Sequence, residues 1–176
     1  AGGRPILGTV GFPFPWKNYD LLARATALAG WGLLLLAPTT PLGQIAAWQS
    51  LNPWLAVAPS FLPAGQIVSY LGGCDATAFL YMCANTGTSA AIRQGIAARK
   101  PLLATAGCRQ FRDLEGDPFG GIRWLTNLSP EGVAQALSYV PIGLRLDAGV
   151  HALAERDSWA KQAATYAQII EGLCGS

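Results

Sequence analysis

Unbroken apolar runs, separated by segments with helical periodicity, are the feature of this sequence that most constrains its fold. Residues 6–12 read ILGTVGF and residues 33–37 read LLLLA, without the polar–apolar alternation of a half-exposed strand. Between them, the apolar residues of 18–29 recur at the spacing of one helix face. Strands that are apolar on both sides and alternate with helices predict an α/β fold, in which helices cover both faces of a parallel sheet.

The same alternation continues along the chain. The expected strands span residues 6–12, 33–37, 54–58, 77–81, 102–104 and 122–125. The expected helices span residues 18–29, 41–50, 64–71, 89–98, 129–139 and 148–172, with one further helical turn at 111–114 and a break near Asp157 and Ser158. This order predicts a three-layer Rossmann-like domain with a mainly parallel sheet of about six strands.

The length of 176 residues suits one domain with a substantial core. We expect a linker at residues 1–4, the Rossmann-like domain at 5–147, and a helical tail at 148–176 that packs on the domain or toward a further domain. Charged residues make up 12% of the chain, against roughly 25% in an average soluble domain. Such a thin polar surface fits either a face covered by another domain or an alanine-rich natural composition.

Charge, hydropathy and cysteine usage narrow the function classes. The net charge of +2 favours neither a nucleic acid nor an anionic membrane as partner, although peripheral membrane association stays open. The longest apolar run, residues 31–38, is too short to span a bilayer, and no signal segment opens the chain. Four scattered cysteines without a CxxC pair, and one histidine, predict no metal site and fit a reducing, cytoplasmic compartment.

Two polar loops are expected at the carboxyl edge of the sheet, where such folds bind ligands. The loop CANTGTS, residues 83–89, precedes a helix whose first amides and dipole can hold a phosphate, with Gly87 allowing close approach and Thr88 or Ser89 donating a hydroxyl. The loop GFPFPWKN, residues 11–18, places Lys17 at a helix start. A cation is unfavourable there because it opposes the helix dipole, so a lysine at this position is better explained if an anion binds beside it.

Each of these candidates has a simpler reading. Ser89 can serve only as a helix cap and Gly87 only as a turn residue, and Lys17 can be an ordinary solvated lysine. Arg109, after the fifth strand, can offer a guanidinium to a phosphate or a sugar, or can belong to a surface turn from which Phe111 packs inward.

The ordered set of segments resembles a known family. It is carried by VGFPFPWKNYDLL, WGLLLLAP, SFLPAGQIVSYLGGCDATAFLY, GTSAAIRQGIAARKPLLATAG and SWAKQAATYAQII. Together these cover roughly residues 5–172 and resemble the C-terminal, donor-binding half of retaining GT-B glycosyltransferases of the glycosyltransferase group 1, or family four, type. The resemblance implies half of a GT-B fold, a nucleotide-diphosphate sugar as donor substrate, and no other cofactor.

The family's first loop carries an arginine and a lysine that contact the donor pyrophosphate. Here Gly11 and Lys17 match that pattern, whereas Phe12 stands in place of the arginine and Asn18 in place of a glycine. The family's two glutamates, eight positions apart, fall on Thr86 and Gln94. Gln94 can still bond a ribose hydroxyl, whereas Thr86 supplies no negative charge, so the catalytic residues stay unassigned.

The resemblance also implies contacts with the nucleotide and the sugar. Phe61 and Leu62 fall in the stretch that meets the base in the family, although Phe61 can equally be a core aromatic. Tyr81 ends the fourth expected strand and could reach the donor sugar or pack at the rim, and Asn85 is a further candidate for the sugar. Arg93 is a candidate substitute charge that should project about 100° away from Gln94. Tyr166 in the tail helix can contact the N-terminal half or pack in the core.

We therefore expect a donor-binding domain of a glycosyltransferase that transfers a hexose, with polysaccharide biosynthesis as the setting that the family suggests. An N-terminal acceptor-binding domain would be its partner, and the 176-residue chain alone should show little or no transfer. The alternative is a non-catalytic, degenerate glycosyltransferase-like module that binds or scaffolds. A NAD-type enzyme is disfavoured because no GxGxxG opens the first helix.

Overall fold

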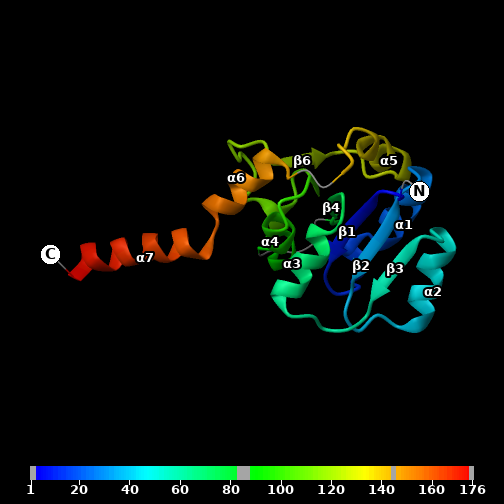
Figure 1. Cartoon of the computed structure of the whole chain (residues 1–176), viewed down its shortest axis with the longest axis horizontal. Coiled ribbons are helices and arrows are strands. Elements are labelled where there is room, and N and C mark those ends of the chain that lie inside the picture. Colours follow the sequence, from blue (N-terminus) through cyan, green and yellow to red (C-terminus); the bar gives the residue numbers. More distant parts are fainter. Residues whose placement is uncertain (1–2, 83–87, 144–145, 175–176) are drawn as a thin grey trace.

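The computed structural model describes residues 3–82, 88–143 and 146–174, and its centre is a sheet in which all strand pairs are parallel (Figure 1). The spatial order is β3-β2-β1-β4-β5-β6. The strands are β1 (Ile6–Val10), β2 (Gly32–Leu36), β3 (Leu55–Ala58), β4 (Ala76–Phe79), β5 (Leu102–Thr105) and β6 (Ile122–Leu125). The predicted α/β class with a parallel sheet of six strands is confirmed.

Helices cover both faces of this sheet. They are α1 (Tyr19–Leu28), α2 (Leu42–Leu51), α3 (Ala64–Gly72), α4 (Ala90–Ala97), α5 (Pro130–Ser138), α6 (Ala148–Arg156) and α7 (Trp159–Cys174), with short 3-10 helices η1 (Pro15–Lys17) and η2 (Arg109–Phe111). One core cluster joins the sheet to α1, α2 and α5 through Leu22, Trp48 and Val133. The other joins it to α3, α4 and α6, so the domain has three layers.

The strand order places a topological switch point between β1 and β4. From β1 the chain builds outward through β2 and β3, and then returns to add β4, β5 and β6 on the other side. Open α/β sheets bind ligands in the crevice outside the carboxyl ends of the strands at such a switch point.

Two strands end earlier than the sequence predicts, and both differences shape this crevice. The expected strand 6–12 stops at Val10 because Gly11 has a φ of 138°, a left-handed value that takes the chain out of the sheet. The expected strand 77–81 stops at Phe79, so that Tyr81 lies in the segment that follows β4. Residues that were expected in strands thus contribute to the loops at the carboxyl edge.

The sequence suggested that Lys17 lies at the start of α1, but the structure places it elsewhere. It ends the separate helix η1, and Asn18 follows with a φ of 55°, a left-handed conformation that breaks the chain between η1 and α1. The Lys17 backbone therefore lies just before the N-cap of α1.

Helix α4 lies close against β4 because residue 95 is a glycine. A Cβ atom at Gly95 would lie 2.3 Å from Cε2 of Phe79, a side chain that is fully buried. On the same helix Ile92 and Ile96 are buried, as their spacing predicts. The close approach fixes the position of the start of α4 relative to the end of β4.

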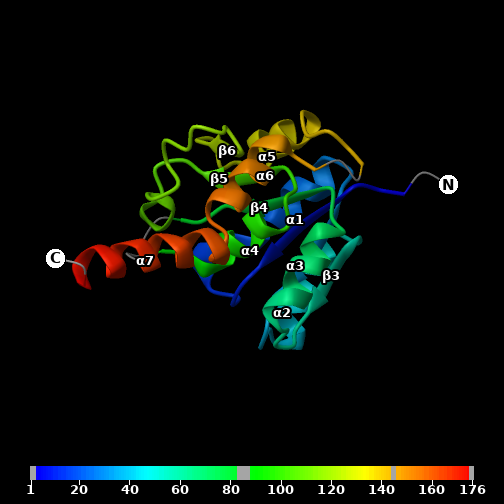
Figure 2. The same cartoon turned by 60° about the vertical axis from the view of Figure 1, so that its left-hand side comes forward.

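The tail is broken where the sequence predicts, since α6 ends at Arg156 and α7 begins at Trp159. Helix α7 projects away from the sheet in both views (Figures 1 and 2). Tyr166 is 64% exposed, so it does not pack in the core. Among the described residues, no helix has the length and apolar character needed to cross a membrane.

Candidate functional site at the carboxyl edge of the sheet

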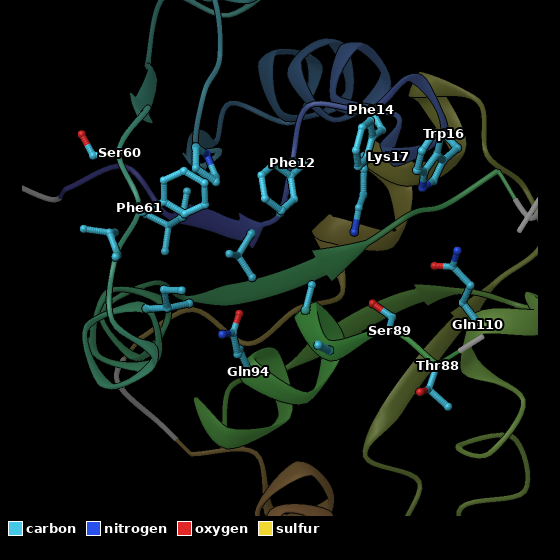
Figure 3. A pocket seen from close by; sticks show the side chains of 18 residues that line it. Phe12, Phe14, Trp16, Lys17, Ser60, Phe61, Thr88, Ser89, Gln94 and Gln110 are labelled. Carbon is cyan, nitrogen blue, oxygen red and sulfur yellow. The ribbon is translucent and has the colours of Figure 1, made fainter. Parts of the chain in front are cut away.

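A cavity of about 400 Å³ opens at the switch point, and we call it the edge cavity. Its wall comes from five regions: the end of β1 with the loop after it, the end of β2 with the residues after it, the segment that runs from β3 into α3, the start of α4, and η2. The lining residues are Val10, Gly11, Phe12, Phe14, Trp16, Lys17, Leu36, Pro38, Ser60, Phe61, Leu62, Ile67, Thr88, Ser89, Ala90, Ala91, Gln94 and Gln110 (Figure 3). Its volume is within the range of small-molecule sites.

Lys17 reaches back from η1 across the crevice. Its Nζ atom donates a hydrogen bond to the hydroxyl of Tyr81 and lies 3.8 Å from the centre of that ring. The Tyr81 hydroxyl in turn lies 3.2 Å from Oγ of Ser89. The ammonium group and the serine at the start of α4, which come from opposite sides of the switch point, are therefore joined through one tyrosine hydroxyl.

Burial sets the charge state of Lys17. The residue is only 8% exposed, so it is not the solvated surface lysine of the simpler reading. Loss of hydration lowers the pKa of Lys17 from 10.5 to about 8, against a smaller opposing effect of Cys108. At pH 7 the side chain is still mainly protonated, and it offers a poorly hydrated positive charge next to the cavity.

The path of Lys17 requires a glycine at position 11. A Cβ atom on Gly11 would lie 3.0 Å from Nζ of Lys17, and the φ of 138° would strain any other residue. The carbonyl of Gly11 accepts a hydrogen bond of 2.9 Å from the hydroxyl of Tyr19. Gly11 therefore turns the chain and leaves room for the lysine at the same time.

Ser89 occupies the N-cap position of α4, but its side chain makes no capping hydrogen bond. Its hydroxyl lies against Tyr81 instead, and its backbone N–H donates to the carbonyl of Gln110 at 3.2 Å. In contrast, Ser129 accepts a bond from the amide of Gly132, as a serine cap should. The reading of Ser89 as an ordinary cap is wrong, and Ala90 and Ala91 begin α4 at the cavity wall.

An aromatic wall faces these polar groups. The rings of Phe14 and Trp16 stack with centroids 4.3 Å apart, and the ring of Phe12 lies 5.8 Å from those of both Phe14 and Phe61. Phe61 is 70% exposed, so the reading of this residue as a core aromatic is wrong. Contiguous exposed aromatic rings are typical of surfaces that bind a ligand or a partner.

The structure brings most of the sequence candidates to one place. Eight of them line the edge cavity: Gly11, Phe12, Lys17, Phe61, Leu62, Thr88, Ser89 and Gln94. Tyr81 is 1% exposed and lies beneath the cavity, in contact with Lys17 and Ser89. Asn85, Thr86 and Gly87 lie outside the described residues.

Two arginines that the sequence offered lie elsewhere. Arg109 is exposed on η2 and does not line the cavity. Arg93 forms ion pairs with Asp113 and Asp157, on the side of α4 that faces the α6–α7 junction. Among the described residues that line the cavity, Lys17 is thus the single one with a charged side chain.

Phe14, Trp16 and Gln110 are among the wall residues that sequence reasoning missed. Phe14 and Trp16 alternate with prolines in GFPFPWKN, and this spacing was a usable signal, because prolines at positions 13 and 15 stiffen the loop that presents them. Gln110 lines the cavity next to Arg109, and the sequence carried no sign that the amide rather than the guanidinium would face inward.

The donor set of the cavity suits an organic ligand with an anionic part. It combines one ammonium, the hydroxyl of Ser89, the amide of Gln94 and a long apolar wall. Among the described residues no group of three His, Cys, Asp or Glu side chains could hold a metal ion. The thiols of Cys74 and Cys108 are free and buried.

Neither a family model nor a curated protein matches the sequence. Solved structures do match the fold. A glycosyltransferase from Rickettsia africae aligns with a TM-score of 0.71 and 15% identity, over 99% of this chain and 49% of its own. Sucrose-phosphate synthase from Thermosynechococcus elongatus aligns at 0.70 and 13%, over 98% and 46%. Trehalose 6-phosphate synthase from Burkholderia multivorans aligns at 0.64 and 11%, over 98% and 43%.

At these identities the similarity shows the fold. The chain has the Rossmann-like fold of GT-B glycosyltransferases and spans about half the length of the solved structures that it matches.

Proposed function

We propose that this chain is the donor-binding domain of a glycosyltransferase and that a nucleotide-diphosphate sugar occupies the edge cavity. The observation that carries the proposal is the meeting of Lys17, Ser89 and the start of α4 around one cavity at the switch point. Backbone amides at a helix start and an ammonium group are the groups that stabilise a phosphate. The fold of the matched glycosyltransferases supports the same function.

In this proposal each part of the wall meets one part of the donor. Lys17, Ser89 and the amides of α4 take the diphosphate, Phe61 and Leu62 take the base, and Gln94 takes a ribose hydroxyl. The positive charge would stabilise the leaving diphosphate as the bond to the sugar breaks, which is the role of electrostatic stabilisation in group transfer. The sugar would face the acceptor that a second domain supplies, because this chain spans only half of the matched structures.

Ligand-induced stabilisation tests the proposal. We expect UDP, GDP or one of their sugars, added at 100 times its dissociation constant, to raise the free energy of unfolding by about 2.7 kcal/mol. Thermal unfolding followed by circular dichroism measures this shift, and uridine and guanosine serve as controls that lack the diphosphate.

The nucleosides should stabilise the protein much less than the diphosphates do, because they make no contact with Lys17. If no nucleotide shifts the unfolding temperature, the proposed function is wrong and the non-catalytic binding or scaffolding module becomes the better account. If UDP and uridine bind equally well, the assignment of the diphosphate to Lys17 and Ser89 is wrong.

A further inference from the structure

A second cavity lies on the other side of the loop that follows β1, and we call it the second cavity. Its volume is about 360 Å³, which is within the range of small-molecule sites. Its wall comes from that loop, the start of α1, helix α2 and the segment after β4, and its lining residues include Phe14, Asn18, Asp20, Gln44, Trp48 and Met82. The donor that we assign to the edge cavity leaves the second cavity without a ligand.

The loop after β1 divides the two cavities from each other residue by residue. Phe12 and Trp16 line the edge cavity, Pro13 and Pro15 line the second cavity, and Phe14 lines both. Ligands in the two cavities would therefore lie on either side of the same short stretch of chain. A transfer reaction needs its donor and its acceptor held next to each other in this way.

The polar groups of the second cavity are a carboxylate and an amide. Oδ1 of Asp20 accepts a hydrogen bond of 2.5 Å from Nε1 of Trp48, a side chain that is only 3% exposed. Trp48 in turn packs edge-on against the ring of Tyr19, with centroids 5.4 Å apart. Within the described part of the chain, the second oxygen of Asp20 and the side-chain amide of Gln44 make no hydrogen bond. One fixed carboxylate and one amide are thus available to a ligand.

The charge of the second cavity excludes an anionic ligand. Among the described residues that line it there is no lysine, arginine or histidine, and Asp20 contributes a negative charge. A phosphate there would face a carboxylate without any compensating cation, so the diphosphate of the donor does not belong in it. The second cavity therefore differs in kind from the edge cavity, where Lys17 supplies a positive charge.

The apolar part of the wall suits the ring of a neutral sugar. Phe14 is 46% exposed and is held by stacking on Trp16 with centroids 4.3 Å apart, and Met82 is 49% exposed. The C–H face of a pyranose ring packs on such apolar surfaces. Its adjacent hydroxyls can donate to a carboxylate and can both donate to and accept from an amide.

We propose, building on the function proposed above, that the second cavity binds one neutral hexopyranose unit of the acceptor. Asp20 and Gln44 would bond adjacent hydroxyls of this sugar, and Phe14 would contact the acceptor on one side and the donor on the other. The domain would then contribute an acceptor subsite of its own, and a second domain would complete the acceptor site rather than supply all of it.

The first test follows the indole N–H of Trp48 by NMR, because this group is bonded to Asp20 and lies at the proposed subsite. The chain has six tryptophans, and Trp48→Phe assigns the signal. Methyl α-glucoside, methyl α-mannoside or methyl α-galactoside should shift it in a saturable way, with a dissociation constant in the millimolar range. The signal of Trp31, which lines neither cavity, should not move. If none of the three glycosides shifts the Trp48 signal, the proposal is overturned.

Substitutions locate the sugar. Asp20→Asn can still accept the Trp48 bond but replaces the other oxygen by an NH₂ group, so glycoside binding should weaken about tenfold, as for the loss of one hydrogen bond to a charged group. Gln44→Ala should weaken it several-fold. Gln66→Ala is the matched control, because Gln66 is the third residue of α3 as Gln44 is of α2, yet lines neither cavity.

Unchanged binding in both Asp20→Asn and Gln44→Ala would place the sugar elsewhere and overturn the proposal. If Asp20→Asn does not fold, Gln44→Ala carries the test alone, since Gln44 is exposed.

Competition separates this proposal from the proposed function. We expect the glycoside to bind equally well with and without a saturating nucleoside diphosphate, UDP or GDP. If the diphosphate displaces it, the glycoside occupies the edge cavity, and the acceptor subsite is wrong while the proposed function stands. If UDP-glucose displaces it but UDP does not, the second cavity holds the sugar of the donor, which also overturns the acceptor assignment.

Two further outcomes are distinct. A protein that binds the glycoside at Trp48 but binds neither UDP nor GDP would overturn the proposed function, and with it the role of the sugar as acceptor. Tetramethylammonium that shifts the Trp48 signal at lower concentration than every glycoside would make the second cavity a cation site, and the proposal would be wrong.

Discussion

Lys17→Met is expected to raise the free energy of unfolding at pH 7 by roughly 2 kcal/mol and, in the same protein, to weaken UDP binding about 100-fold. Both effects have one cause. Burial lowers the pKa of Lys17 to about 8, which means that the folded state holds the ammonium group at a cost. Methionine has a similar length, removes the charge and keeps the apolar contacts, so it relieves this cost and loses the anion contact.

The stability advantage of Lys17→Met over the wild type should decrease as the pH rises. Between pH 8 and 10.5 the unfolded chain binds more protons at Lys17 than the folded chain does, so the wild type gains stability as the pH rises through this window. Lys17→Met lacks this contribution. Its advantage should be full below about pH 8 and should disappear near pH 10.5.

Thermal unfolding between pH 6 and 10 checks this prediction, and an increase of about 5 °C at pH 7 is expected for a protein of this size. Lys161→Met, on the exposed face of α7, is the matched control and should change neither stability nor binding. A Lys17→Met protein that is less stable than the wild type at pH 7 would show that the Tyr81 contact outweighs the loss of hydration.

Gly95→Ala is expected to lower the free energy of unfolding by about 3 kcal/mol, as overpacking in a rigid core does. The new methyl group would lie 2.3 and 2.7 Å from two ring carbons of Phe79, and that ring is fully buried. The helix must therefore move away from β4. Because α4 carries Ser89 and Gln94, the same movement should also weaken nucleotide binding.

Gly43→Ala is the matched control for this substitution. Gly43 lies in the first turn of α2, and a Cβ atom there would meet no neighbouring group within 4 Å beyond its own helix backbone and adjacent residues. Alanine should therefore stabilise the protein by about 0.4–1 kcal/mol. Chemical denaturation of both variants, with UDP titration of each, separates the close approach of α4 from the general effect of alanine in a helix. Equal stability of Gly95→Ala and the wild type would mean that Phe79 can move aside.

The sequence predicted the fold well because doubly buried strands carry a strong and simple pattern. The runs at β1 and β2 are apolar on both sides, and Gly30, which has a φ of 73°, ends the first helical segment as expected. Strand ends were predicted less well. The exits at Gly11 and after Phe79 depend on contacts between loops, such as the bond from the amide of Met82 to the carbonyl of Trp16.

The sequence predicts where the candidate site lies, at the carboxyl edge of the sheet, but it does not predict which side chains contact one another there. Loop positions follow from the alternation of strands and helices, so the sequence predicts Lys17 and Ser89 at the same edge of the sheet. Their connection through Tyr81 was not predictable, because a tyrosine at the end of a strand carries no sign of where its hydroxyl points. Likewise, the ion pairs that hold Arg93 away from the cavity involve Asp113 and Asp157, which are 20 and 64 residues away in sequence.

The missing side-chain cap on α4 has a consequence for the dynamics of the domain. Since the hydroxyl of Ser89 is turned toward Tyr81, it does not hold the amide hydrogens of the first helical turn, and uncapped ends of short helices open easily. A bound phosphate would accept hydrogen bonds from these amides and so stabilise the first turn of α4. Amide hydrogen exchange at positions 90–92 should then be rapid in the free domain and slow when the nucleotide is bound. The exchange rate of this one helical turn would therefore report whether a nucleotide occupies the cavity.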